Sequence, residues 1–290
     1  MPSRSVLPLL CLTALCLACC HEPIPTASRT IRIVTANLTS GNGQDYDAGH
    51  GNRILQGLDP DIALIQEMSY LSNTPQDLRA WVDATFGREF VYFREPGPGI
   101  PNGIVSRFPI RSAGEWDDPT IDNRDFAWAR IDIPGAKDLW AISVHLKASS
   151  DSASQRTREA RELLSHVKQS IPKDDYVVLG GDFNTHDRGE PCLQTLADYF
   201  VIGGPYPVDQ RGDGDTNANR NSPYDWVLAD ADLHGLRTAV IIGSNSFPDG
   251  LVFDSRKYTA LTSVAPVKAG DSSAPNMQHM AVVRAFTIPH

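Results

Sequence analysis

The stretch from Tyr176 to Asn184, which reads YVVLGGDFN, decides the fold. Its first four residues form a short apolar run of the kind that makes a buried strand. Two glycines follow, where the backbone can turn sharply or let another group approach closely. Asp182 and Asn184 then point the same way if the strand continues. The stretch predicts a strand that brings a carboxylate and an amide to the edge of a sheet, which suits metal-assisted attack on a phosphate. A loop with an Asx turn is the structural alternative.

The same design recurs at other predicted strands. Asn37, Glu67 and His145 each follow directly after an apolar run, and Asp225 and His279 each stand at the start of one. In a sheet with alternating strand directions, these positions all lie along one edge. Each residue alone has an ordinary explanation, because a strand-end Asn caps turns and a single His is usually structural. Their recurrence predicts one site that is rich in carboxylates, amides and imidazoles.

Strands and helices intermingle through the rest of the chain without a short repeat or a Pro/Gly/Ser-rich linker, which predicts one domain over residues 30–289. We expect strands at 31–36, 62–66, 90–93, 103–106, 110–112, 126–133, 139–144, 176–184, 225–229, 236–242 and 280–286. We expect helices at 52–58, 75–86, 152–170 and 190–200. Residues 203–222 form a long polar loop of the kind that often serves as a lid or binding loop, and residues 244–258 are expected to be irregular.

In these motifs the chain resembles the endonuclease/exonuclease/phosphatase superfamily, which includes DNase I. The matching pieces, in family order, are TANL at Asn37, LIQE at Glu67, GIVSRFPI at 103–110, SVHL at His145, GDFN ending at Asn184, YDWVL at Asp225 and QHMAVV at His279. The resemblance implies an α/β (α+β) fold, a four-layer α-β-β-α sandwich of two packed and mostly antiparallel sheets. It also implies hydrolysis of phosphoester bonds with the help of a divalent metal ion.

The resemblance assigns a role to each matching residue. Glu67 is the expected principal metal ligand with Asn37 beside it, and the expected ion is Mg²⁺, with Mn²⁺ as the alternative. His279 is the expected general acid–base, and Asp225 would fix its tautomer. Asp182 would orient or deprotonate the attacking water. Two further side chains would contact the water, the phosphate or the leaving oxygen, namely Asn184 and His145.

One position departs from the family. Gln278 stands immediately before His279, where the family usually has Asp. The change removes a negative charge beside the cation, so it predicts weaker metal binding or a changed metal preference. Basic residues of the two irregular segments are the expected substrate phosphate contacts, namely Arg211, Arg220, Arg256 and Lys257.

The composition leaves the substrate open. The chain has 290 residues, a formal net charge of −9 and a pI near 5.3, and a chain this acidic lacks the basic footprint of non-specific nucleic-acid binding. A nuclease remains the first hypothesis. A sphingomyelinase-like or phospholipase C-like enzyme acting on a phospholipid head group is the second, and a phosphatase of small molecules is the third. A binding module on a degraded scaffold belongs to a different class.

The N-terminus predicts export. Residues 1–20 read as a lipoprotein signal peptide, with Cys20 as the lipidated residue and Cys19 as the alternative. Residues 21–29 read as a tether. We expect a monomeric lipoprotein of the cell envelope, on its periplasmic face or at the cell surface, and a plain secreted protein is the alternative. Only Cys192 remains in the body, so the folded part cannot contain an internal disulfide.

Overall fold

The computed structural model describes residues 27–38, 49–97, 99–275 and 277–290. The predicted signal peptide 1–20, with Cys19 and Cys20, lies outside the described residues, as does most of the predicted tether. No helix in the described part of the chain is long and apolar enough to cross a membrane.

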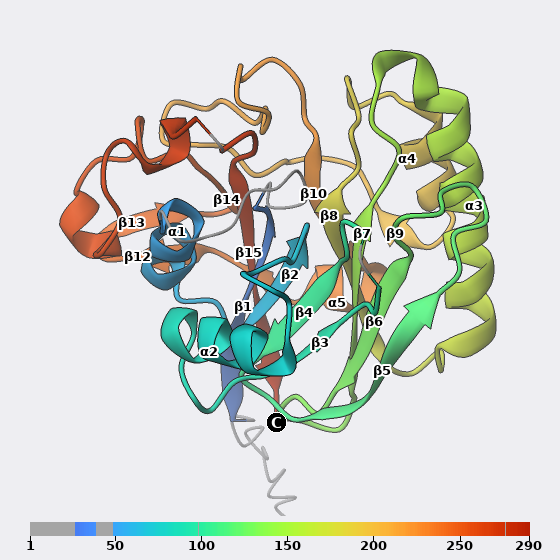
Figure 1. Cartoon of the computed structure of the whole chain (residues 1–290). Helices are drawn as coiled ribbons and strands as arrows, with labels where there is room; N and C mark the ends of the chain where they lie inside the picture. The colour runs from blue at the N-terminus through green and yellow to red at the C-terminus, as the bar shows by residue number, and fades with distance from the viewer. Residues whose placement is uncertain (1–26, 39–48, 98, 276) are drawn as a thin grey trace, which may run out of the picture.

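Two sheets that pack against each other form the centre of the molecule (Figure 1). The first contains, in spatial order, β11 (Arg237–Thr238), β15 (Ala281–Pro289), β1 (Ser28–Asn37), β2 (Ile62–Gln66), β4 (Gly103–Ser106) and β3 (Val91–Arg94), and β14 (Leu251–Phe253) also pairs with β15. The second contains β5 (Ile110–Trp116), β6 (Phe126–Ile131), β7 (Leu139–His145), β8 (Tyr176–Asp182), β10 (Asp225–Asp230) and β9 (Phe200–Val201). Within these two sheets the described pairs are antiparallel except β1 with β2 and β7 with β8, which confirms the predicted mostly antiparallel arrangement.

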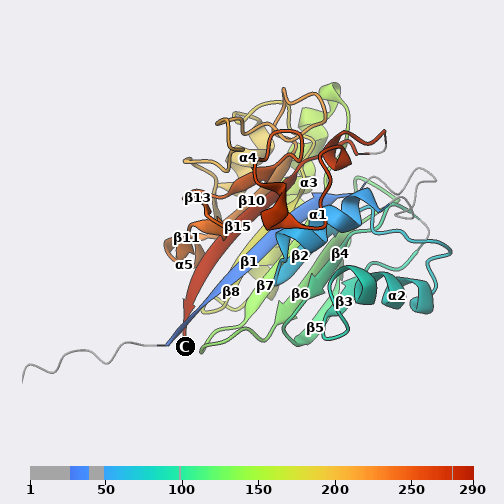
Figure 2. The ribbon, with the colours of Figure 1, turned by 90° about the vertical axis from the view of Figure 1, so that its left-hand side faces the viewer.

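Helices cover the two outer faces and complete the four predicted layers. The first sheet is covered by α1 (His50–Leu58) and α2 (Pro75–Thr85), and Figure 2 looks onto that side. The second sheet is covered by α3 (Ala153–Ser170) and α4 (Pro191–Leu196). Short 3₁₀ helices lie at η1 (Ser150–Ser152), η2 (Leu261–Val264) and η3 (Asp271–Ser273).

Three apolar clusters hold the layers together. One lies under α1 and α2, one fills the space between the sheets, and one lies under α3 and α4. Strand β8 shows why this sequence forms a central strand, because Val178 faces the inter-sheet cluster while Val177 and Leu179 face the cluster under α3. Each such side chain contributes about 1.5–3 kcal/mol when it is fully buried.

The second half of the chain differs from the prediction in three places. The predicted strand 236–242 is divided into β11 and β12 (Val240–Ile242), preceded by the short helix α5 (Ala231–Gly235). The division arises because β11 pairs with β15, whereas β12 pairs with β13 (Asn245–Phe247). Residues 244–258 were expected to be irregular, but they contain β13 and β14.

The other differences concern the ends of elements. The predicted helix 190–200 stops at Leu196, and Phe200 already pairs with Asp230 of β10. Strand β1 begins at Ser28, opposite Pro289, so the last residues of the predicted tether belong to the first sheet. Element ends depend on partners that are distant in the sequence, which explains why these bounds were misjudged.

Candidate active site

The strand ends predicted to share an edge do meet. Strands β1 and β2 run parallel, as do β7 and β8, so their carboxyl ends lie at the same end of the two sheets. Strands β15 and β10 run antiparallel to β1 and β8, which brings their amino ends to the same place. Pairing sets Asp182 directly beside His145 on one side and Asp225 on the other. The edge is therefore formed by two facing sheets rather than by one.

Asp182 lies at the centre of the cluster. Its Oδ2 accepts a hydrogen bond from Nδ2 of Asn37 at 3.0 Å, which joins the first sheet to the second. The same oxygen lies 3.3 Å from Nε2 of His145 and 3.5 Å from Nε2 of His279. Asp182 is 1% exposed, and this burial raises the pKa of its carboxyl to about 6. The charge of His279 acts in the opposite direction.

His279 lies between two carboxyl groups. Its Nδ1 is 3.0 Å from Oδ2 of Asp225, and its Nε2 faces Asp182. Burial alone would lower the pKa of this imidazole, but the charges of Asp225 and Asp182 outweigh burial and raise the pKa to about 9. The imidazole is therefore positively charged at neutral pH.

Glu67 and His145 complete the other side of the cluster. Oε1 of Glu67 accepts a hydrogen bond from Nδ2 of Asn37 at 3.3 Å and lies 4.0 Å from Nδ1 of His145. Burial, together with the charges of Arg124 and His279, lowers the pKa of His145 well below its usual value, so this imidazole is neutral. Glu67 has φ of 56°, a left-handed conformation that is unfavourable for a side chain of this size and that is characteristic of functional sites.

The GDFN stretch contains both structures that its sequence predicts, the end of a strand and an Asx turn. Strand β8 ends at Asp182, and the backbone N–H of Asn184 donates to Oδ1 of Asp182 at 2.9 Å, which is an Asx turn. Strand alternation therefore does not align the two side chains. Nδ2 of Asn184 donates to the carbonyl of Leu146 at 3.0 Å, and this bond fixes the amide beside the cluster. The close approach expected at the glycines is present, since a Cβ on Gly181 would lie 1.9 Å from the carbonyl oxygen of Val144.

Sequence reasoning missed Arg124. Its guanidinium donates to the carbonyl oxygens of His145 and Leu146, with an Nη2 to Leu146 distance of 3.0 Å. Burial lowers the pKa of Arg124, and the charges of Asp182 and Glu67 are among those that raise it. This arginine belongs to a polar loop before β6 and has no distinguishing neighbour in the sequence, so no local signal could have identified it.

The loop 203–222 supports the cluster from the side of β10 and β15. Oγ1 of Thr216 accepts a hydrogen bond from the backbone N–H of Asp225 at 2.8 Å. The carbonyl oxygen of Thr216 accepts a hydrogen bond from the backbone N–H of Met280 at 2.7 Å. The neighbouring Asn217 forms a backbone bridge with His279. Through these contacts the loop sets the separation of Asp225 and His279.

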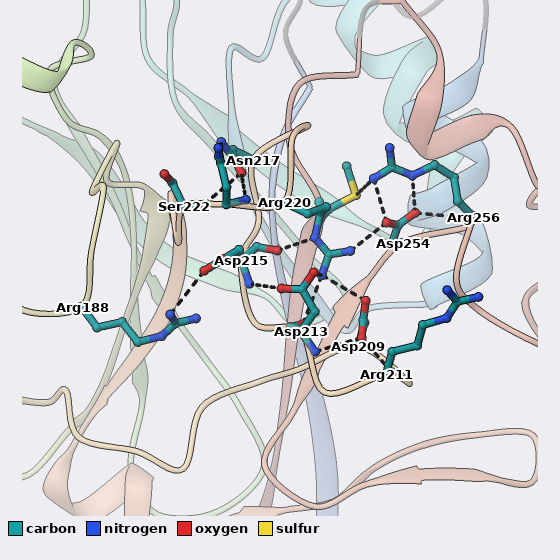
Figure 3. Close-up of polar contacts among 12 residues, drawn as sticks. Arg188, Asp209, Arg211, Asp213, Asp215, Asn217, Arg220, Ser222, Asp254 and Arg256 are labelled. Atoms are coloured by element: carbon teal, nitrogen blue, oxygen red, sulfur yellow. Dashed lines mark hydrogen bonds and ion pairs between the residues drawn. The ribbon is translucent and has the colours of Figure 1, made fainter.

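The expected phosphate contact at Arg220 is replaced by a structural role. Its side chain is 8% exposed and forms ion pairs with Asp254 at 2.7 Å and with Asp209 at 3.1 Å, as Figure 3 shows. Arg256 binds the same Asp254 through two nitrogen atoms, at 2.8 and 2.7 Å. We therefore do not retain Arg220 as a phosphate contact, because internal carboxylates hold its guanidinium.

The remaining predicted substrate and metal residues lie further out. Arg211 is exposed, and its side chain points away from the ion pairs in Figure 3. Lys257 is half-buried, and its backbone N–H donates to the carbonyl of Asp254. Gln278 is exposed between the buried residues Met277 and His279.

The cluster fits a divalent cation. Ligand atoms of Asp182, Asp225 and His279 lie within 4.8 Å of one another, but Asp225 and His279 already bind each other. The oxygen atoms of Glu67 and Asp182, with the amide of Asn37 between them, supply the oxygen-rich donor set that Mg²⁺ prefers. In the arrangement seen here the nitrogen of that amide faces the carboxylates, and a half-turn of the amide would present its oxygen.

A model of the Endonuclease/Exonuclease/phosphatase family matches residues 52–249. The chain belongs to this family. Members of the family are generally phosphoester hydrolases that depend on a divalent metal ion. The fold and the predicted family are thereby confirmed. No curated protein sequence matches the chain.

Solved structures of the family share the fold at low sequence identity. D. rerio TDP2 in complex with a single-strand DNA product is 16% identical, with a TM-score of 0.58 over 89% of this chain and 98% of that one. A family protein from Bacteroides thetaiotaomicron is 13% identical, with a TM-score of 0.60 over 91% of this chain and 100% of that one. Beta toxin from Staphylococcus aureus is 15% identical, with a TM-score of 0.53 over 88% of this chain and 99% of that one.

Proposed function

We propose that this family member is a phosphodiesterase that uses Mg²⁺ or Mn²⁺. The observation that carries the proposal is the buried row Asp225–His279–Asp182, which lies next to Glu67 and Asn37. A charged imidazole between two carboxyl groups, beside an oxygen-rich donor set, has the components that hydrolysis of a phosphodiester requires.

Each residue contributes in a way that follows from its surroundings. Glu67 and Asn37 would hold the metal ion, which supplies polarisation of the phosphoryl oxygens when bound. Asp182 orients the attacking water and accepts its proton, because a carboxyl with pKa about 6 is ionised at neutral pH yet basic enough to take a proton. Asp225 keeps His279 protonated, so Nε2 donates to the phosphate or to the leaving oxygen. The neutral His145 donates a hydrogen bond without adding charge.

Turnover of bis-p-nitrophenyl phosphate by the full-length protein tests this proposal. We expect turnover in Mg²⁺ or Mn²⁺, none in EDTA, and a loss of at least about 10²-fold in Glu67→Gln, because that change removes the charge of the proposed principal ligand and keeps its shape. A folded protein that binds the metal by calorimetry but shows no turnover would instead support a binding module.

A cavity beside Arg124 favours a phospholipid head group as the second candidate substrate class. It has a volume of about 260 Å³, and its lining includes Glu115, Asp122 and Asp125. Negative walls next to the site repel a nucleic-acid backbone and attract a cationic group such as choline. A nucleic acid remains the first candidate, because family members act on phosphoester substrates that include DNA.

Two substrates separate these classes. If the cavity receives a cationic head group, p-nitrophenyl phosphorylcholine will be turned over faster than single-stranded DNA, and Asp122→Asn will raise its KM about threefold or more. The same variant should leave the KM of bis-p-nitrophenyl phosphate unchanged. Faster cleavage of DNA than of the choline ester would establish the nuclease.

We further propose that the protein is exported and anchored by lipid at Cys20. The support is the apolar segment before Leu17-Ala18-Cys19-Cys20 in the sequence. Membrane fractionation of Cys20→Ala and Cys19→Ala tests it, and we expect only the first variant to leave the membrane fraction. Recovery of the wild type and both variants outside the membrane fraction would favour plain secretion.

A further inference from the structure

Arg284 lies at an unusual place for a charged side chain. It belongs to β15, and its neighbours on the same strand face, Val282 and Phe286, are members of the apolar cluster between the two sheets. Arg284 itself is 7% exposed. A guanidinium group is thus inserted at the margin of the inter-sheet core.

One nitrogen atom of this guanidinium is buried without a hydrogen-bond partner. Within the described residues, Nε of Arg284 has no hydrogen-bond partner. Burial, together with the charge of Arg237, lowers the pKa of Arg284 to about 10, while the charge of Asp249 acts in the opposite direction. Burying an uncompensated cation is strongly unfavourable, so retention of this one calls for a counter-charge.

Arg284 lines a small cavity. The lining includes Arg188, Tyr206, Gly214, Thr216 and Asp225 as well as Arg284. The cavity has a volume of about 20 Å³, which is enough for one small group and too little for a large ligand. The guanidinium of Arg188 stacks on Tyr206 at 5.2 Å and pairs with Asp215 at 3.3 Å, so a second cation stands at the same cavity.

We propose that this cavity binds a single oxyanion of the phosphate type, with Arg284 as its main ligand. The planar fork of a guanidinium matches two oxygen atoms of such an anion. Asp225 forms part of the wall. His279 binds its Oδ2, and its Oδ1, which has no hydrogen-bond partner among the described residues, can accept a hydrogen bond from a protonated oxygen of the anion. The cavity shares Asp225 with the candidate active site, but its lining does not include Asp182, His279 or Glu67, and the proposal does not depend on the proposed function.

Gly214 offers a way to close the cavity without changing a charge. A Cβ at Gly214 would lie 2.7 Å from Nη2 of Arg188 and 3.0 Å from the carbonyl oxygen of Pro207. Gly214→Ala therefore moves Arg188 and narrows the cavity while Arg284 stays in place.

Thermal unfolding and calorimetry with inorganic phosphate test the proposal. The full-length protein is titrated in EDTA, so that no metal ion can hold the anion. We expect saturable binding and a rise in Tm of about 3 °C at ten times the Kd. Arg284→Met should abolish this response and raise the Tm in the absence of phosphate, because it replaces an uncompensated cation with an apolar side chain. Gly214→Ala should weaken phosphate binding at least threefold.

Two controls keep the outcome decisive. His145→Ala, which alters the candidate active site but keeps the Asp225–His279 pair, should retain the phosphate response, and Arg284→Lys serves if Arg284→Met does not fold, with at least tenfold weaker binding expected. Phenyl phosphate, titrated alongside, shows whether the cavity takes a free ion or the phosphate of a larger molecule, and binding of either through Arg284 supports the site. Absence of any response in the wild-type protein, a response that survives Arg284→Met, or one that disappears in His145→Ala overturns the proposal.

Discussion

Two clusters of buried charged side chains lie along the loop 203–222, and they are built in opposite ways. Around Arg220, the guanidinium groups of Arg220 and Arg256 and the carboxylates of Asp209 and Asp254 neutralise one another at 2.7–3.1 Å. In the candidate active site, Oδ1 of Asp225 and Nδ1 of His145 are buried without a hydrogen-bond partner among the described residues. The pKa of the imidazole between Asp225 and Asp182 is raised at the same time.

The difference separates a structural cluster from one prepared for a ligand. Where buried polar groups bind each other, their mutual hydrogen bonds and ion pairs offset the cost of burying them. Removing one member then leaves the others uncompensated. Where polar atoms stay unmatched and pKa values are displaced, an additional group is needed to complete the arrangement. The following variants test this distinction.

The largest effect is expected on turnover, from a substitution in the candidate active site. His279→Ala removes the charged imidazole, and we expect kcat to fall about 10²–10⁴-fold. His166→Ala is the matched control, because His166 is half-exposed on α3 and should leave kcat unchanged. Equal losses in both variants would contradict the assignment.

A large effect on stability is expected in the Arg220 cluster. Arg220→Met leaves Asp209 buried without its counter-charge and Asp254 with Arg256 alone, so the free energy of unfolding should fall by about 3–5 kcal/mol. Denaturant unfolding measures this change. Arg211→Met in the same loop provides the control, because Arg211 is exposed, and a change within about 0.5 kcal/mol is expected. If the two variants lose the same stability, the cluster is not structural.

The smallest effect is expected at Gln278, next to His279. Gln278→Asp adds a negative charge beside the proposed metal site, so the affinity for Mg²⁺ should rise about two- to tenfold with little change in Tm. Calorimetric titration of the metal into both proteins measures the difference. Identical metal affinities would show that the charge at this exposed position does not affect metal binding.

The comparison also explains what could be predicted from the sequence. Glu67, His145 and Asp182 were predicted because they stand at the ends of strongly apolar strands. Strand pairing sets His145 beside Asp182, and the packing of the two sheets brings Glu67 to the same end of the fold. Four layers and two sheets follow from the same strands and from the amphipathic helices.

The rest depends on contacts between distant segments. Arg124, Thr216 and Arg284 act through backbone carbonyls, loop turns or the inter-sheet space, and none has a sequence pattern that reveals such a partner. Arg220 illustrates the opposite error, since a basic residue in a polar loop was taken for a phosphate contact until its carboxylate partners were known. The division of the predicted strand 236–242 has the same origin, because its first part pairs with β15 and its second part pairs with β13.

The pH dependence of kcat/KM for wild type and Asp225→Asn tests the central claim most directly. We expect wild-type activity to hold up to about pH 9 and then to fall tenfold per pH unit, because His279 must stay protonated. Removing the negative charge of Asp225 lowers the pKa of His279, so the alkaline limb should move to lower pH in Asp225→Asn. An alkaline limb at the same pH in both proteins would contradict the proposed role of the Asp225–His279 pair.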